Sequence, residues 1–118
     1  GEPIQQFGDG TTRRDYTYID DTVDGILAAM KYSKSFDIFN LGESETVELR
    51  YLISQLEQVL GRKAEVQVLP PQPGDVPVTY ADIAKARSLL GYSPQTKIQE
   101  GLKKFADWFL SQRGWEKS

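Results

Sequence analysis

The chain has 118 residues, of which 39% are hydrophobic and 11% aromatic, which is enough for one small domain with a modest core. Its net charge of −3 comes from 14 basic and 17 acidic residues and argues against a general nucleic-acid binder, which needs a basic face. Because the sequence has no cysteine and no histidine, disulfides, thiolate chemistry and a Ser-His-Asp site are excluded within it, and a zinc site would need carboxylates alone.

The sequence lacks the marks of a membrane or secreted protein. No segment is apolar for long enough to cross a membrane, and the first residues carry no apolar signal region. We therefore predict a cytoplasmic protein with no membrane partner and no metal site. Residues 1–4 are more typical of the middle of a domain than of a natural start, so we expect a truncated part of a longer protein.

Strand and turn patterns open the chain. Residues 4–7 predict a strand that ends at the glycine turn 8–10, and residues 15–19 predict a second short strand from their aromatic and β-branched side chains. Asp20 or Asp21 then predicts a helix N-cap, since a carboxylate accepts the free amide protons of a first turn. Four apolar side chains share one face of that helix: Val23, Ile26, Leu27 and Met30.

The middle of the chain carries the clearest helical pattern. A strand is predicted over residues 36–41, and Thr46 is a suitable cap for the helix that follows. Apolar residues recur with a 3.6-residue period over 49–60, and Gly61 suits the left-handed position at the helix end.

The last third begins with a strand pattern over residues 64–69. Residues 70–77 contain four prolines and predict no regular structure. Asp82 is a suitable cap for a short helix ending before Gly91. A final helix is predicted over 98–110, with four side chains facing inward: Ile98, Leu102, Phe105 and Phe109. The whole pattern indicates an α/β fold (mixed α+β), with short strands, about four helices and no complete Rossmann domain.

Two segments are candidates for ligand binding. The glycine turn before Arg13 and Arg14 can hold an anion, because the planar fork of arginine suits phosphate oxygens, but it can equally be a solvated hairpin tip. The proline segment can present Asp75 to a pair of sugar hydroxyls, or can be a plain connector. From the residues alone, both interpretations of each segment stay open.

Taken together, four motifs resemble those of the extended short-chain dehydrogenases, in the family's order. Residues 7–21, FGDGTTRRDYTYIDD, match G-x-G-x-x-x-R-D-[FY]-x-[YH]-[VI]-x-D, and residues 39–42, FNLG, match [YF]-N-[IL]-G. Residues 72–82 contain QPGDV and then YAD, and residues 89–102 contain LLGYSP and then EGL. The resemblance covers nearly the whole chain and is strongest to UDP-glucuronate and UDP-glucose 4-epimerases.

The resemblance implies a small C-terminal substrate-binding domain that binds the nucleotide part of a UDP-sugar. The backbone around Gln5 and Phe7 would meet the uracil, with Phe7 near its ring. Arg14 would bind the diphosphate, and Asp75 would bind the ribose hydroxyls. Many relatives have a second diphosphate-binding arginine where this chain has Gln72, which keeps hydrogen-bond donors but loses the charge.

Two parts of the family's chemistry are missing from the sequence. It contains no G-x-x-G-x-x-G turn for a dinucleotide, and no tyrosine is followed by a lysine four residues later. We therefore expect residues 1–118 to form one domain without NAD or catalytic residues, which depends on an N-terminal NAD-binding domain outside the chain. In the full-length enzyme, the resemblance implies 4-epimerisation by transient oxidation, in which hydride passes to NAD and returns to the other face of the sugar.

Two alternatives remain. The same scaffold serves dehydratases, decarboxylases and reductases, whose deciding residues would lie outside this chain. A non-catalytic protein-interaction module would not need Arg14 and Asp75 to converge. The resemblance also implies that part of this region lies against the dinucleotide-binding sheet, so a truncated chain exposes apolar surface and is predicted to self-associate.

Overall fold

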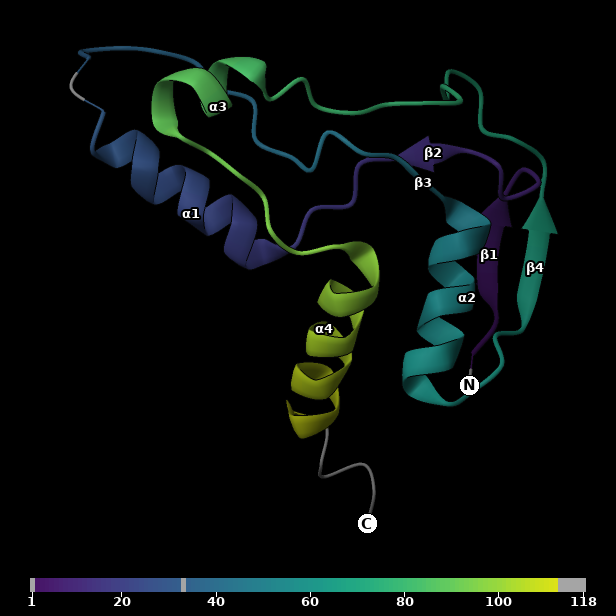
Figure 1. Ribbon diagram of the computed structural model, residues 1–118. Helices are drawn as coiled ribbons and strands as arrows, with labels where there is room; N and C mark the ends of the chain where they lie inside the picture. Colours follow the sequence, from purple (N-terminus) through teal and green to yellow (C-terminus); the bar gives the residue numbers. More distant parts are fainter. Residues whose placement is uncertain (1, 33, 113–118) are drawn as a thin grey trace.

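The computed structural model describes residues 2–32 and 34–112, which form an open, flattened molecule. Its extents are 48 × 39 × 20 Å and its radius of gyration is 17.1 Å, whereas about 13–14 Å is typical of a compact chain of this length. In Figure 1, helices α1 and α3 lie side by side, and extended segments connect them to a second group that contains the strands and helix α2.

Four short strands form two separate sheets. β1 (Ile4–Phe7) pairs in parallel with β4 (Val66–Leu69), and β2 (Arg13–Arg14) pairs antiparallel with β3 (Val47–Glu48). The strand patterns at residues 4–7 and 64–69 are therefore confirmed. The mixed α/β character is confirmed as well, and the described residues contain no complete Rossmann sheet.

Four helices correspond to the four predicted ones. They are α1 (Ile19–Met30), α2 (Leu49–Leu60), α3 (Ala84–Leu90) and α4 (Ile98–Gln112). Gly61 and Gly91 end α2 and α3 with φ of 64° and 66°, the left-handed conformation that a side chain would disfavour. None of the described helices is both long and apolar enough to cross a membrane.

The predicted caps of α1 and α2 are wrong. α1 begins at Ile19, so Asp20 and Asp21 lie inside its first turn, and the Asp21 carboxylate accepts hydrogen bonds from another segment. Thr46 precedes β3, and its hydroxyl accepts a hydrogen bond from Arg13. Both side chains satisfy partners that are distant in sequence, which a local capping pattern cannot reveal.

The cap predicted for α3 is close to the observed contact. The Asp82 carboxylate accepts a hydrogen bond from the Ala84 amide at 3.0 Å, at the first residue of the helix. This hydrogen bond joins residues only two positions apart, so the sequence pattern alone could predict the start of α3.

Two predicted strands are also absent. Residues 15–18 have no regular structure because the Asp15 carboxylate binds backbone amides of other segments, and Ile19 is already helical. Residues 36–41 pair with no strand in the described ranges. The Ile38 carbonyl instead accepts a hydrogen bond from the Lys85 ammonium at 2.8 Å.

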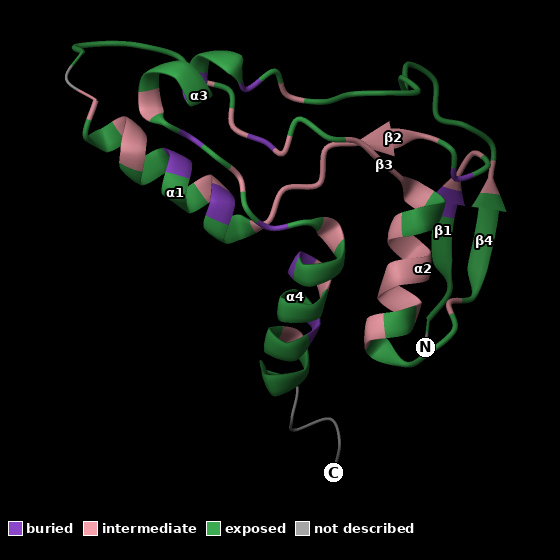
Figure 2. Ribbon diagram, viewed as in Figure 1, coloured by how far each residue is buried: buried purple, intermediate pink, exposed green. Residues whose placement is uncertain are grey.

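The hydrophobic core is thin. Ile83, Ala86 and Tyr92 form its buried centre, and no large side chain in the described ranges is less than 2% exposed. Figure 2 shows few buried segments, and they are spread over the molecule. Phe105 is 49% exposed, so this side chain, predicted to face inward, is not buried. The apolar face of α1 is also bare, as its four members are exposed: Val23, Ile26, Leu27 and Met30.

Candidate functional site

The parallel pairing of β1 with β4 builds the framework of the candidate site. Gln5 lies opposite Gln67 and Phe7 opposite Leu69, and the Gly8 amide donates to the Leu69 carbonyl at 2.9 Å. Because side chains alternate along a strand, Gln5 and Phe7 share one face of β1. The two chain segments that leave β1 and β4 therefore start next to each other, although about sixty residues separate them.

The segment after β4 is held against β2. The Arg13 amide donates to the Pro77 carbonyl at 2.8 Å, and the Thr79 amide donates to the Arg13 carbonyl at 3.1 Å. Residues 70–77, which we call the proline loop, thus run from the end of β4 to the side of β2, and all of them are exposed. These backbone bonds place the proline loop beside Arg14.

Arg14 and Asp75 meet in a direct ion pair. The Arg14 Nη2 donates to Asp75 Oδ1 at 2.5 Å, and the Arg14 Nη1 donates to the Arg13 carbonyl at 2.7 Å. The two side chains of the pair are 29% and 38% exposed. A guanidinium can bind phosphate oxygens and a carboxylate can accept two hydroxyl donors, so this partly exposed pair has the groups that recognise a nucleotide.

The turn inside the proline loop sets the position of Asp75. Its amide donates to the Gln72 carbonyl at 3.2 Å, and Gly74 between them has φ of +83°. In the described ranges, no side-chain hydrogen bond joins Gln5, Phe7 or Gln72 to the ion pair. Gln5 and Gln72 are exposed and Phe7 is half-buried. The structure therefore joins two of the five predicted site residues directly, whereas Gln5 and Phe7 lie on β1 and Gln72 lies in the proline loop.

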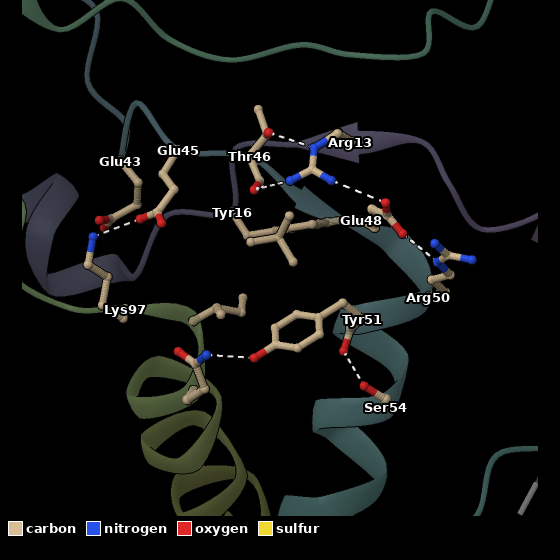
Figure 3. A pocket seen from close by; sticks show the side chains of 13 residues that line it. Arg13, Tyr16, Glu43, Glu45, Thr46, Glu48, Arg50, Tyr51, Ser54 and Lys97 are labelled. Carbon is tan, nitrogen blue, oxygen red and sulfur yellow. Dashed lines mark hydrogen bonds and ion pairs between the residues drawn. The ribbon is translucent and has the colours of Figure 1, made fainter.

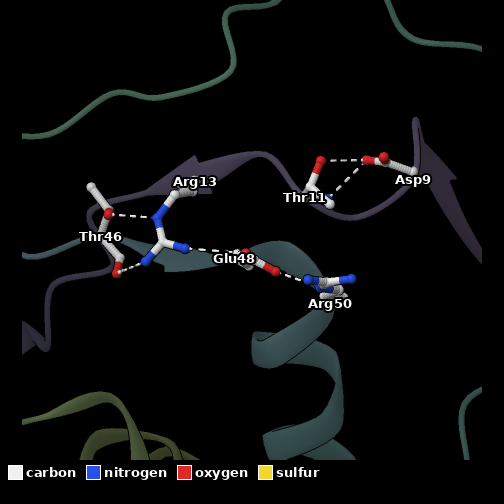
Figure 4. Close-up of polar contacts among 6 residues, drawn as sticks. All are labelled: Asp9, Thr11, Arg13, Thr46, Glu48 and Arg50. Atoms are coloured by element: carbon white, nitrogen blue, oxygen red, sulfur yellow. Dashed lines mark hydrogen bonds and ion pairs between the residues drawn. The ribbon is translucent and has the colours of Figure 1, made fainter.

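Arg13, in contrast, holds the fold together (Figure 4). Its Nε donates to Thr46 Oγ1 at 2.8 Å, its Nη2 donates to the Thr46 carbonyl, and its Nη1 contacts Glu48 at 3.2 Å. With three of its donor groups occupied, Arg13 fixes β2 to β3. Of the two adjacent arginines, Arg14 is therefore the one available at the proline loop.

Local hydrogen bonds between Thr11 and Asp9 hold the glycine turn after β1 (Figure 4). The Thr11 amide and hydroxyl both donate to Asp9 Oδ1, at 3.0 and 2.5 Å. These bonds, first the hydroxyl and then the amide, hold the pKa of Asp9 below its usual range. Asp9 therefore stays ionised as a turn residue.

The cavities lie away from the ion pair. One, of about 650 Å³, opens between the start of α2 and the start of α4, and most of the residues that line it are charged or polar (Figure 3). Its charged groups largely pair with each other, as Lys97 does with Glu45 at 2.7 Å. A second, apolar cavity of about 750 Å³ is lined by aromatic and aliphatic side chains that include Tyr18, Leu52, Leu102, Phe105 and Trp108. Arg14 and Asp75 line neither cavity, so the ion pair lies on an open edge.

A cluster of three carboxyl groups, Asp15, Asp21 and Glu43, was missed from the sequence. Asp15 accepts hydrogen bonds from three backbone amides that lie far along the chain, those of Glu43, Ser44 and Ala81. Asp21 is 3% exposed and accepts from the Gln95 and Thr96 amides at 2.9 and 3.0 Å. Five amides from three separate stretches of chain thus bind two carboxylates that the sequence pattern assigned to a strand and a helix cap.

Burial and neighbouring acids shift the pKa values in this carboxyl cluster. Burial, together with a hydrogen bond to Asp21 and the charges of Asp21 and Asp15, raises the pKa of Glu43 to about 8. Burial also tends to raise the pKa of Asp21, but hydrogen bonds, first from the Gln95 amide and then from Glu43, lower it overall. At neutral pH, Glu43 is therefore protonated and Asp21 ionised.

Close backbone approach completes this region. A side chain at Gly42 would place a Cβ 2.6 Å from the Asp15 carboxylate and 2.8 Å from the Ala81 Cβ, so glycine is required there. Within the described ranges, no group of three acidic, histidine or cysteine side chains has the arrangement needed to hold a metal ion. The amide bonds to Asp15 and Asp21 show that the carboxyl cluster joins segments of the fold.

Comparisons with known proteins fit this geometry. The sequence matches the family model described as GDP-mannose 4,6 dehydratase over residues 1–105. It is 49% identical over 115 residues to the uncharacterized protein MJ1055 of Methanocaldococcus jannaschii and 43% identical over 108 residues to a UDP-glucuronate 4-epimerase of Thermodesulfobacterium geofontis. The matches cover 98% and 91% of this chain but 35% and 33% of those proteins. The chain thus spans about a third of the length of the curated relatives it matches.

Solved structures also match nearly all of this chain over about a third of their own length. UDP-glucuronic acid 4-epimerase from Bacillus cereus, in complex with UDP-glucuronic acid and NAD, matches with a TM-score of 0.84 and 38% identity, over 94% of this chain and 36% of that chain. UDP-glucose 4-epimerase from Thermotoga maritima with UDP-glucose matches with a TM-score of 0.86 and 34% identity, over 95% and 36%. Both likenesses thus extend over nearly the whole of this chain.

Proposed function

The chain belongs to the extended short-chain dehydrogenase family of GDP-mannose 4,6 dehydratase, as a C-terminal part, and we propose that it binds the nucleotide of a UDP-sugar for an NAD-dependent 4-epimerase. The observation that carries this proposal is the contact between Arg14 and Asp75, which 61 positions separate in the sequence. A fold that only mediated protein contacts would not need these two groups to converge.

Each site residue has a role in this proposal. Arg14 binds the diphosphate through its guanidinium, and Asp75 accepts hydrogen bonds from both ribose hydroxyls. Gln5 and Phe7, on one face of β1, contact the uracil, and Gln72 adds uncharged donors beside the diphosphate. Because these contacts hold the nucleotide and leave the sugar free, binding energy from a remote part of the substrate positions the reacting carbon.

NAD is implied by the relatives, but the described residues do not fit it. A dinucleotide site needs a glycine-rich turn that joins a strand to the N-terminus of a helix. Here the glycine turn after β1 leads into β2 instead. We therefore propose that NAD and the acid–base residues belong to the part of the enzyme outside this chain, and we assign this chain no step of the redox chemistry.

Calorimetric titration of this chain with UDP tests the proposal. We expect saturable binding that Arg14→Ala weakens by about 10- to 100-fold, since hydrogen bonds to charged groups contribute about 1.5–3 kcal/mol. Arg62→Ala is the matched control, because it removes the same charge from an exposed residue at the end of α2. Equal UDP binding by the wild type and Arg14→Ala would contradict the proposed site.

The bare apolar face of α1 supports a second proposal, concerning partners. We propose that an NAD-binding domain outside this chain covers this face, and that the bare face makes the isolated chain self-associate. Size-exclusion chromatography with light scattering should give a mass above the 13.3 kDa monomer at high concentration. Ile26→Lys on α1 should restore the monomer, whereas Val68→Lys on β4, which alters another exposed apolar residue, should not. A clean wild-type monomer at high concentration would contradict this proposal.

A further inference from the structure

The two ligand-binding groups of the proposed site occupy each other. Arg14 has one terminal nitrogen on Asp75 and the other on the Arg13 carbonyl, so both ends of its fork are engaged before any ligand arrives. An incoming anion therefore meets a guanidinium that already has a carboxylate partner.

The proline loop keeps Asp75 in this position. Its four prolines restrict the backbone, and the turn at Gly74 and the bonds to Arg13 fix the two sides of the segment that carries Asp75. Since Asp75 has little freedom to swing away, a ligand that takes Arg14 leaves this carboxylate nearby and without its cation.

The chemistry of the ligand then decides the outcome. A simple anion, such as phosphate or pyrophosphate, replaces the carboxylate on Arg14 and gives Asp75 nothing in return, and the two negative charges repel each other. A nucleoside diphosphate supplies an anion to Arg14 and a pair of hydroxyl donors to Asp75, so both groups regain partners. Discrimination of this kind arises from leaving one group unpaired with the wrong ligand.

We propose that Asp75 is a specificity-determining residue that excludes simple phosphate anions by holding Arg14, and that the site opens to ligands carrying both an anion and a vicinal diol. This inference rests on the proposed nucleotide site. The inference goes beyond that site because Asp75 then also weakens the binding of simple anions, which Asp75 itself does not contact. The pair is partly exposed, so the cost of breaking it is small enough for a nucleotide to overcome.

Inorganic pyrophosphate is the probe that isolates this effect. Asp75→Asn keeps the shape of the side chain and removes its charge, and we expect it to bind pyrophosphate about threefold more tightly than the wild type, as the strength of a partly exposed ion pair implies. Glu65→Gln, the matched control, changes the net charge equally at an exposed residue and should leave pyrophosphate affinity unchanged. In an Arg14→Ala background, Asp75→Asn should give no gain, because the group it frees is gone.

Three results would overturn the inference: no gain in Asp75→Asn, an equal gain in Glu65→Gln, or a gain that persists without Arg14. UDP, titrated into the same variants, separates this inference from the proposed function. If UDP binds through Arg14 but pyrophosphate affinity does not rise in Asp75→Asn, the nucleotide site stands and the specificity role falls. If pyrophosphate affinity rises as expected while UDP shows no binding, Asp75 excludes simple anions from Arg14, but the nucleotide site falls, and with it the opening of the site to an anion with a vicinal diol.

Discussion

Arg14 and Asp15 are neighbours in the sequence, yet they belong to two regions with opposite properties. Arg14 pairs with Asp75 on an open edge, where both side chains keep about a third of their surface in solvent. Asp15 belongs to the carboxyl cluster, where carboxylates are satisfied by backbone amides of distant segments. The difference teaches that the partner of a charged group, rather than its place in a motif, decides whether the group is free for a ligand or holds the fold.

Removal of a carboxylate from the cluster should have the largest effect. Asp21→Ala removes a buried carboxylate and leaves the Gln95 and Thr96 amides without their acceptor, and we expect the free energy of unfolding to fall by about 2–4 kcal/mol. Urea denaturation followed by circular dichroism measures this. Asp20→Ala, an exposed neighbour of the same charge, should change stability by less than about 0.5 kcal/mol. Similar losses of unfolding free energy in both variants would show that the buried amide bonds of Asp21 do not set the carboxyl cluster apart.

Glu43 makes the stability of the carboxyl cluster depend on pH. Its pKa is raised from 4.5 to about 8, so between these values the folded chain keeps a proton that the unfolded chain releases. The free energy of unfolding should therefore fall as pH rises through this window. We expect a fall of about 1–2 kcal/mol, because the side chain is only partly buried.

The matched variant for this effect is Glu43→Gln, which cannot titrate. Urea unfolding at about pH 5.5 and about pH 9 should show the fall in the wild type and a flatter dependence in the variant. At the higher pH, the variant should be the more stable of the two, since its amide can donate to the Asp21 carboxylate. Identical pH profiles of stability in the wild type and Glu43→Gln would show that the Glu43 proton does not contribute to the pH dependence of folding.

The smallest effect on folding should come from the ion pair itself. Asp75→Asn breaks a partly exposed pair, and we expect the free energy of unfolding to change by less than about 1 kcal/mol. Urea denaturation beside Asp21→Ala gives the comparison directly. A loss for Asp75→Asn as large as that for Asp21→Ala would show that the proline loop supports the fold as well as the proposed ligand.

Much of the fold was predictable because its signals are local. The 3.6-residue period of α2, the glycines at positions 61 and 91, and the prolines of the loop act on the backbone around them. The strand predicted over 36–41 failed because an apolar run becomes a strand only when a partner strand is present, and none pairs with it in the described ranges.

The site was predictable in part, for a related reason. The motifs predicted Arg14 and Asp75 as site residues. Their contact, however, depends on backbone bonds between Arg13 and the chain at Pro77 and Thr79. The roles of Asp15 and Asp21 could not be predicted, since their amide partners lie between 28 and 75 positions away. A carboxylate at a helix start has the same local pattern whether it binds its own helix or another segment.

The parallel pairing of β1 with β4 has a consequence for folding kinetics. Parallel strands need a long crossover, and here the intervening chain includes α1 and α2. The entropy of closing this loop is lost before any contact between Arg14 and Asp75 offsets it, so the candidate site depends on contacts of high sequence separation. We therefore expect the helices to form early and the nucleotide-binding edge to be among the last parts of the chain to assemble.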